Sequence, residues 1–125
     1  MSTYRLETLF APRSVAIVGA SPRKTSTGRA VLENLLGSGF PGAIHLVNPR
    51  YDEIAGVRSV KSYDALSDTP DVVAIAVPPP AVPEAVAAAA RRSGACLAVW
   101  RDRRRLGAMG RRPRRWVFRY CVDRR

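Results

Sequence analysis

Histidine and cysteine are scarce in this sequence, with 1 His and 2 Cys among 125 residues. His45 stands alone inside a predicted strand, where a histidine usually packs against its neighbours, so no ligand or catalytic role is predicted for it. Cys96 and Cys121 are too few and too far apart in the sequence for a zinc signature. A disulfide between them is not expected in the cytosol. The composition therefore predicts no metal site and offers no set of catalytic side chains.

Long hydrophobic runs are absent as well. The longest weakly polar stretch, residues 72–90, is interrupted by four prolines and by Glu84, which excludes a transmembrane helix. The first ten residues, MSTYRLETLF, lack the apolar segment and the cleavage site of a secretory signal. We therefore expect a cytoplasmic protein without a membrane partner.

Lysine and acidic residues become rare after residue 95. Residues 1–95 hold 10 Lys and Arg against 8 Asp and Glu, whereas residues 96–125 hold 11 Arg, no Lys and 2 Asp. The net charge of +11 is therefore concentrated in the last part of the chain. A chain of this length is enough for one compact domain. We expect residues 1–95, or 1–100, to form that domain, and residues 101–125 to be an Arg-rich tail.

Short apolar segments alternate with helical patterns in the first part of the chain. Strands are predicted at Val15–Val18, Ala43–Val47, Val57–Val60 and Val72–Val77, with a fifth starting at Leu97–Trp100. Apolar runs of this kind suit strands that are buried on both faces. The repeated β-α-β pattern predicts an α/β fold, a Rossmann-like doubly wound parallel sheet. Its expected strand order is 3-2-1-4-5, with an incomplete C-terminal edge.

The segment Ser14–Gly28, SVAIVGASPRKTSTG, combines a strand, a turn of small residues and the start of a helix. Small residues let the backbone approach a phosphate, and the N–H groups at a helix start favour an anion. Ligands of doubly wound sheets bind at the carboxyl ends of the strands, where the strand order reverses. The predicted crevice is lined by three turns: Gly19-Ala20-Ser21, Asn48-Pro49-Arg50 and Val77-Pro78. The alternative is an ordinary turn that needs small residues for packing.

This crevice departs from two common nucleotide sites. An NAD site has the pattern G-x-G-x-x-G and an acidic residue after the second strand. Here Ser21 and Lys24 occupy the second and third glycine positions, and Arg50 follows the second strand. A P-loop is excluded because Lys24 precedes Gly28 instead of following it. Since an arginine can hold a phosphate on the ribose, the sequence favours coenzyme A (CoA) or NADP as ligand.

Three motifs match a known family in order: LFAPRSVAIVGAS, GFPGAIHLVNPRYDEIAGV and PDVVAIAVPPPAVPEAV. From about Leu6 to Ala95 the chain resembles the CoA-binding domain of NDP-forming acyl-CoA synthetases. That domain is similar to the one in the succinyl-CoA ligase alpha subunit, and it also begins certain protein acetyltransferases. The resemblance implies that CoA phosphates are cradled by Gly19, Ala20, Ser21 and Gly28. It also implies that the adenosine phosphate end meets Asn48, Pro49 and Arg50, and that the ligand contacts Val77 and Pro78.

The resemblance assigns no catalytic residue to this chain. The phosphohistidine of these ligases lies in a separate downstream domain, and His45 does not match its position. We therefore expect a piece of a longer acyl-CoA ligase or acetyltransferase that binds CoA or acyl-CoA without catalysing a reaction alone. Its expected partners are the downstream ligase domains. An NADP-binding or redox-sensing regulatory domain on the same fold is the alternative.

The chain departs from the family after residue 95. The family continues with a fifth strand and a turn of the Ser-Ala-Gly kind, whereas this chain reads CLAVW and then RDRRRLGAMGRRPRRWVFRYCVDRR. Three interpretations stay open. Eleven arginines without lysine fit a GC-rich gene translated out of frame. A disordered basic tail without function is the second interpretation. An arm that contacts nucleic acid through arginines and aromatic residues is the third, although we do not expect a nucleic-acid partner.

Overall fold

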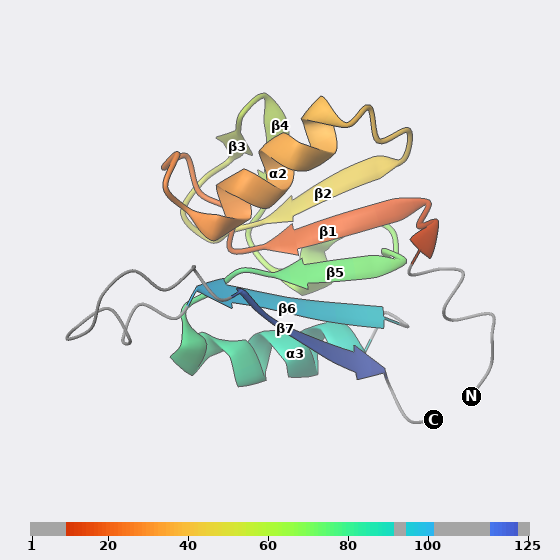
Figure 1. Ribbon diagram of the computed structural model, residues 1–125, viewed down its shortest axis with the longest axis vertical. Coiled ribbons are helices and arrows are strands. Elements are labelled where there is room, and N and C mark those ends of the chain that lie inside the picture. The colour runs from red at the N-terminus through yellow and green to blue at the C-terminus, as the bar shows by residue number, and fades with distance from the viewer. Residues whose placement is uncertain (1–9, 92–94, 102–115, 123–125) are drawn as a thin grey trace.

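A computed structural model describes residues 10–91, 95–101 and 116–122, and its strands form one seven-stranded sheet (Figure 1). The strands are β1 (Ser14–Val18), β2 (Ala43–Val47), β3 (Glu53–Ile54), β4 (Val57–Val60), β5 (Val72–Ile75), β6 (Ala95–Arg101) and β7 (Trp116–Val122). The helices are α2 (Thr27–Gly37) and α3 (Val82–Ala90), with the short 3-10 turns η1 (Tyr63–Ala65) and η2 (Pro79–Ala81). None of the helices in these ranges has the length and apolarity needed to cross a membrane.

The sheet has the order β3-β4-β2-β1-β5-β6-β7. Five of its strands, β4, β2, β1, β5 and β6, run parallel to one another. They correspond to the predicted order 3-2-1-4-5, so the doubly wound α/β fold is confirmed. From β1 the chain first builds the sheet outward through β2 and β4, and then returns to the other side of β1 with β5. The strand order therefore reverses between β1 and β5, which is where this class of sheet binds ligands.

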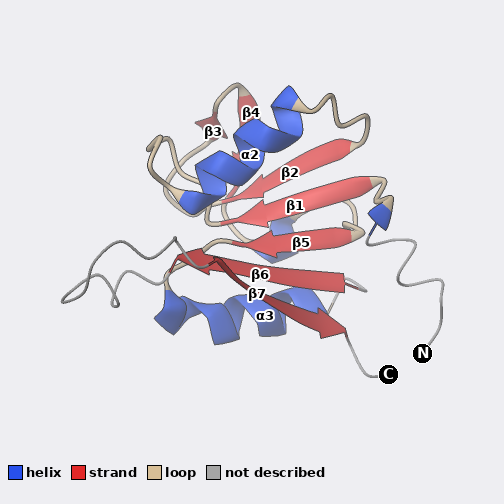
Figure 2. Cartoon of the chain, in the orientation of Figure 1, coloured by secondary structure: helices blue, strands red, loops and turns tan. Residues whose placement is uncertain are grey.

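Helices cover both faces of the sheet, with α2 on one face and α3 on the other (Figure 2). Val15 and Ile17 of β1 belong to the core under α2, whereas Ala16 belongs to the core under α3 and η1. Successive residues of a strand point to opposite faces. A central strand with both faces covered is therefore apolar at its buried positions on both faces, and this explains why residues 15–18 of β1 and all of β5 have no polar alternation.

The last strand, β7, lies within the segment 101–125 that the sequence predicts to be an Arg-rich tail. There β7 pairs antiparallel with β6, from Arg101 opposite Trp116 to Ala95 opposite Val122. Aromatic and β-branched residues favour strands, and WVFRYCV is rich in both. The origin of residues 101–125 in a changed reading frame, and the boundary at residue 95, stay predictions; residues 1–9, 92–94, 102–115 and 123–125 lie outside the described ranges.

Candidate functional site

Backbone hydrogen bonds join the end of β1 and the turn after it to the segments on both sides. The Gly19 N–H donates to the carbonyl of Val47 at 3.0 Å, and the Ala76 N–H donates to the carbonyl of Val18 at 2.8 Å. Gly19 has a φ of +93°, and a Cβ there would lie 2.8 Å from both the Ala76 carbonyl oxygen and Val77 Cγ1. Only glycine satisfies both the backbone angle and the close approach. The first and third predicted turns are therefore in direct contact.

Helix α2 begins directly against this turn. Ser26 caps the helix, its hydroxyl accepting from the Arg29 N–H at 3.3 Å. Gly28, in the first helical turn, is buried, and a Cβ on it would lie 2.6 Å from the Cα of Ala20. Ala20 itself is fully buried. The positive end of the helix dipole is therefore held against the small-residue turn, as an anion site requires.

Asn48 connects the second turn to the first. Its Nδ2 donates to the carbonyl of Ala20 at 2.6 Å, and its Oδ1 accepts from the Arg50 N–H at 2.9 Å. The backbone N–H of Asn48 donates to the carbonyl of Val60 at 2.9 Å. Only 9% of the surface of this residue is exposed. Asn48, assigned to the ligand by the resemblance, thus has both side-chain polar atoms engaged within the protein, and it positions the turns.

The remaining site residues continue the same turns toward solvent. Pro49, Arg50 and Pro78 are exposed, and Ser21 is half-buried. The Ser21 hydroxyl accepts from the Arg23 N–H at 3.2 Å, and the Pro78 carbonyl accepts from the Ala81 N–H at 2.9 Å. The site residues that the structure brings into direct contact across the turns are Gly19, Ala20, Gly28, Asn48 and Val77. Among the described residues, no hydrogen bond or salt bridge joins the Arg50 side chain or Pro78 to the Gly19 turn.

Two cations near this edge of the sheet are already paired. Arg29 Nε lies 2.8 Å from Glu33 Oε1, one helical turn along α2. Lys61 Nζ lies 2.6 Å from Asp52 Oδ1. The hydrogen bond from Lys61, and then its charge, lower the pKa of the exposed Asp52 carboxyl. In these two salt bridges both charges are neutralised by a neighbouring side chain, so neither cation is free to pair with a ligand phosphate.

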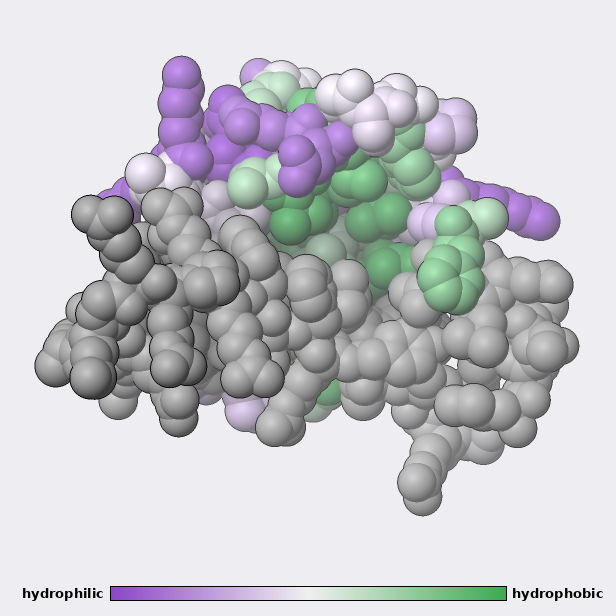
Figure 3. Space-filling view, in the orientation of Figure 1, coloured by the Kyte–Doolittle hydropathy of each residue, from purple (hydrophilic) through white to green (hydrophobic). Residues whose placement is uncertain are grey.

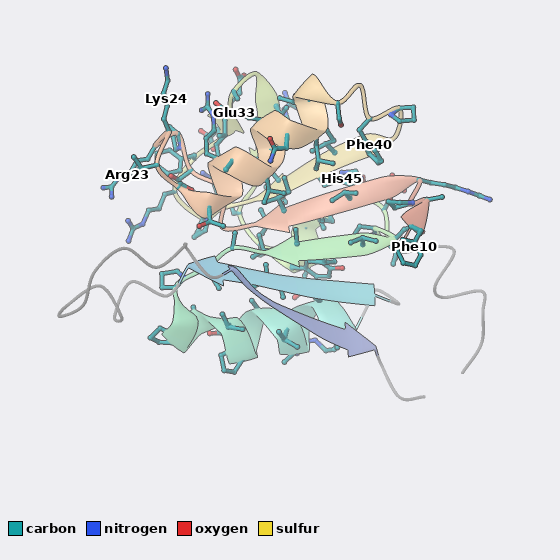
Figure 4. The ribbon with its side chains drawn as sticks, in the orientation of Figure 1. Phe10, Arg23, Lys24, Glu33, Phe40 and His45 are labelled. Carbon is teal, nitrogen blue, oxygen red and sulfur yellow. The ribbon has the colours of Figure 1, made fainter. Side chains whose placement is uncertain are left out.

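Three cations in the loops after β1 and β2 have no salt-bridge partner in the described ranges: Arg23, Lys24 and Arg50. Arg23 and Lys24 lie in the exposed loop between the Gly19 turn and α2, and both extend into solvent (Figure 4). Hydrophilic side chains gather over this loop and α2 in the space-filling view (Figure 3). Arg23 was not predicted as a site residue. The sequence feature that could have indicated Arg23 is the pair of basic residues between the glycine turn and the start of the helix.

His45 lies away from the three turns. It is in the middle of β2, opposite Ala16 of β1, and is seen at the centre of the sheet in Figure 4. Its Nε2 is buried and has no hydrogen-bond partner among the described residues. The structure does not bring it to the crevice, and nothing in the described ranges assigns it a chemical role.

We expect Asn48→Ala to lower the free energy of unfolding by about 1–3 kcal/mol, because the buried Ala20 carbonyl loses its donor. Urea denaturation followed by circular dichroism measures the loss. Asn34→Ala is the matched control, since Asn34 is exposed on α2 and a surface change costs less than about 0.5 kcal/mol. An equal effect of the two substitutions would contradict the connecting role of Asn48.

Comparison with known proteins now identifies the family. The sequence profile of the CoA binding domain matches residues 13–103. Among solved structures, the dinucleotide-forming acetyl-coenzyme A synthetase 1 of Ca. Korarchaeum cryptofilum, in complex with phosphate and ADP, is similar with a TM-score of 0.67 and 34% identity. That match covers 70% of this chain and 19% of the other. A hypothetical protein from Pyrococcus horikoshii OT3 is similar with a TM-score of 0.61 and 30% identity, covering 72% of this chain and 62% of that one.

Curated relatives are much longer than this chain. The acetate–CoA ligase (ADP-forming) of Methanocaldococcus jannaschii is 41% identical over 81 residues, which is 65% of this chain and 11% of that protein. A trans-feruloyl-CoA synthase from an unknown prokaryotic organism is 33% identical over 99 residues, 79% of this chain and 14% of that protein. The chain thus spans 11% to 14% of the length of these two relatives.

The fold and the three turns define a nucleotide-binding domain of the doubly wound α/β class. Within that class, the chain belongs to the CoA-binding domain family. The family resemblance stated from the sequence motifs is confirmed, and so is coenzyme A as the cofactor.

Proposed function

We propose that this chain binds CoA in the crevice formed by its three turns. The pyrophosphate lies at the Gly19 turn and the start of α2, and the adenosine 3′-phosphate lies near Arg50. The observation that carries the proposal is the contact of Gly28 with Ala20, which holds the helix start against the turn at the point of strand reversal. The unpaired charges of Arg23, Lys24 and Arg50 favour a ligand with several phosphates.

We infer that the chain contributes binding, and that other domains of an acyl-CoA ligase or acetyltransferase contribute the reaction. The residues of the three turns include no His, Cys, Asp or Glu, so they offer no general base that could activate the Ser21 hydroxyl as a nucleophile. The named functions of the relatives, acetate–CoA ligase and feruloyl-CoA synthase, belong to proteins of which this chain covers 11% and 14%. The downstream domains of such a ligase are the proposed partners, and an acyl-CoA is the proposed bound product.

Arg50→Ala is expected to weaken CoA binding by about tenfold to a hundredfold, because a charge-assisted phosphate contact contributes about 1.5–3 kcal/mol. Binding of 3′-dephospho-CoA should change little, since that ligand lacks the phosphate in question. Isothermal titration calorimetry with both ligands measures the difference.

Arg91→Ala is the control for this prediction, because it removes the same charge from an exposed position at the far end of α3. It should leave both affinities unchanged. If Arg50→Ala weakened CoA and 3′-dephospho-CoA equally, Arg50 would not contact the 3′-phosphate. Binding of NADP more tightly than CoA to the unaltered chain would instead support the alternative NADP-binding function.

A further inference from the structure

The two cysteines of the chain occupy directly opposed positions in the sheet. In the antiparallel pairing of β6 with β7, Cys96 is the register partner of Cys121. Opposed residues of an antiparallel pair have Cα atoms about 4.5 or 5.5 Å apart, depending on the hydrogen-bonding pattern. A disulfide spans Cα atoms about 4.4–6.8 Å apart. Either type of pair therefore brings the two backbones within the range that a disulfide requires.

The two cysteine positions also share a face of the sheet. Cys96 is the register partner of Val73 in β5, which belongs to the core on the α3 face. Cys121 is directly opposite Cys96, and the residues of a strand alternate between the two faces of a sheet. The position of Cys121 is therefore on the same face as that of Cys96. A cysteine one position earlier or later in β7 would have the opposite face instead. The register therefore meets both backbone conditions for a disulfide, which are a short Cα separation and a common face.

We propose that Cys96 and Cys121 form an intramolecular disulfide that locks β7 onto β6 under oxidising conditions. The oxidant is a low-molecular-weight disulfide. One thiolate attacks it to give a mixed disulfide, and the second thiolate displaces the small thiol. The two cysteines together lose two protons and two electrons, and the small disulfide takes them up as two thiols. This makes the outer edge of the sheet redox-sensitive, a property separate from CoA binding.

The test is oxidation of the full chain with glutathione disulfide, followed by intact-mass measurement and thiol counting. We expect both free thiols to disappear with the loss of two hydrogen atoms from a monomer. By linkage, a disulfide that stabilises the folded chain is itself stabilised by folding. The equilibrium constant for closing it should therefore be about a hundredfold larger in native buffer than in concentrated guanidinium chloride, and the oxidised chain should melt about 10 °C higher.

A variant in which one cysteine is shifted by one position distinguishes a disulfide that depends on the strand register from one formed by a chance encounter of two thiols. The double variant Cys121→Ser with Tyr120→Cys moves the thiol by one position, to the opposite face of β7. It should give mixed disulfides with glutathione and no intramolecular bond. The proposal is overturned if the unaltered chain keeps two free thiols or gives only mixed disulfides or dimers. It is also overturned if the shifted variant closes as readily, or if denaturation leaves the equilibrium constant unchanged.

Discussion

Gly19→Val is expected to abolish CoA binding and to lower the free energy of unfolding by about 4 kcal/mol or more, which is at the upper end of single-residue effects. Two costs add at this position. A β-branched residue is strained at the φ of +93° that Gly19 adopts. A Cβ would also lie 2.8 Å from the backbone oxygen of Ala76, and backbone cannot rotate away as a side chain can. Because small domains have only about 5–15 kcal/mol of stability, much of it would be lost.

Circular dichroism melting and calorimetry with CoA, performed below the melting point, measure both effects. Gly39→Val is the matched control, since Gly39 also has a positive φ, of +71°, but no atom lies within 4 Å of the point that its Cβ would occupy. Gly39→Val should lower the free energy of unfolding only by the cost of the backbone strain, and it should leave CoA binding unchanged. Gly19→Ala gives an intermediate case that is more certain to fold. If it folds and binds CoA with the affinity of the unaltered chain, the phosphates are not bound at this turn.

The order of the central strands could be predicted because two local signals agree. Strands such as VVAI have no polar alternation, which indicates burial on both faces and hence a parallel sheet with helices on each side. Glycine and proline turns divide these strands from the helices. Handedness and connection rules then leave few arrangements of the β-α-β units. Gly19 and Gly28 were identified from the same local pattern, and the structure gives each a close backbone neighbour.

The parts that could not be predicted depend on contacts between residues distant in the sequence. Asn48 bonds to the carbonyl of Ala20, 28 residues earlier, and nothing in its own neighbourhood indicates this partner. The pairing of β7 with β6 is equally nonlocal, because it joins segments separated by residues 102–115. The aromatic and β-branched residues of β7 favour a strand, but they do not indicate which strand it pairs with.

Gly28→Ala is expected to destabilise the domain by about 2 kcal/mol or more, although alanine is the better helix former by about 1 kcal/mol. The added Cβ would lie 2.6 Å from the Cα of Ala20, 2.9 Å from its nitrogen and 2.9 Å from the Gly19 carbonyl oxygen. All three atoms belong to the backbone, so the helix must move away from the turn, and overpacking of this kind costs about 1–3 kcal/mol or more. Moving the helix start also moves the N–H groups that face the phosphates, so CoA should bind at least tenfold more weakly.

Gly37→Ala, in the same helix, is expected to have the opposite sign. A Cβ on Gly37 has no neighbour within 4 Å and its φ is not positive, so the substitution should stabilise the domain by about 0.5–1 kcal/mol by restricting the unfolded chain. Urea denaturation and CoA titration of both variants test the pair together. Helix propensity favours alanine at both positions. If Gly28→Ala lowers the free energy of unfolding and Gly37→Ala raises it, the difference comes from the contact between α2 and the Gly19 turn. Two stabilised variants with normal CoA affinity would mean that the helix start does not lie against that turn, and the phosphate site would have to be placed elsewhere.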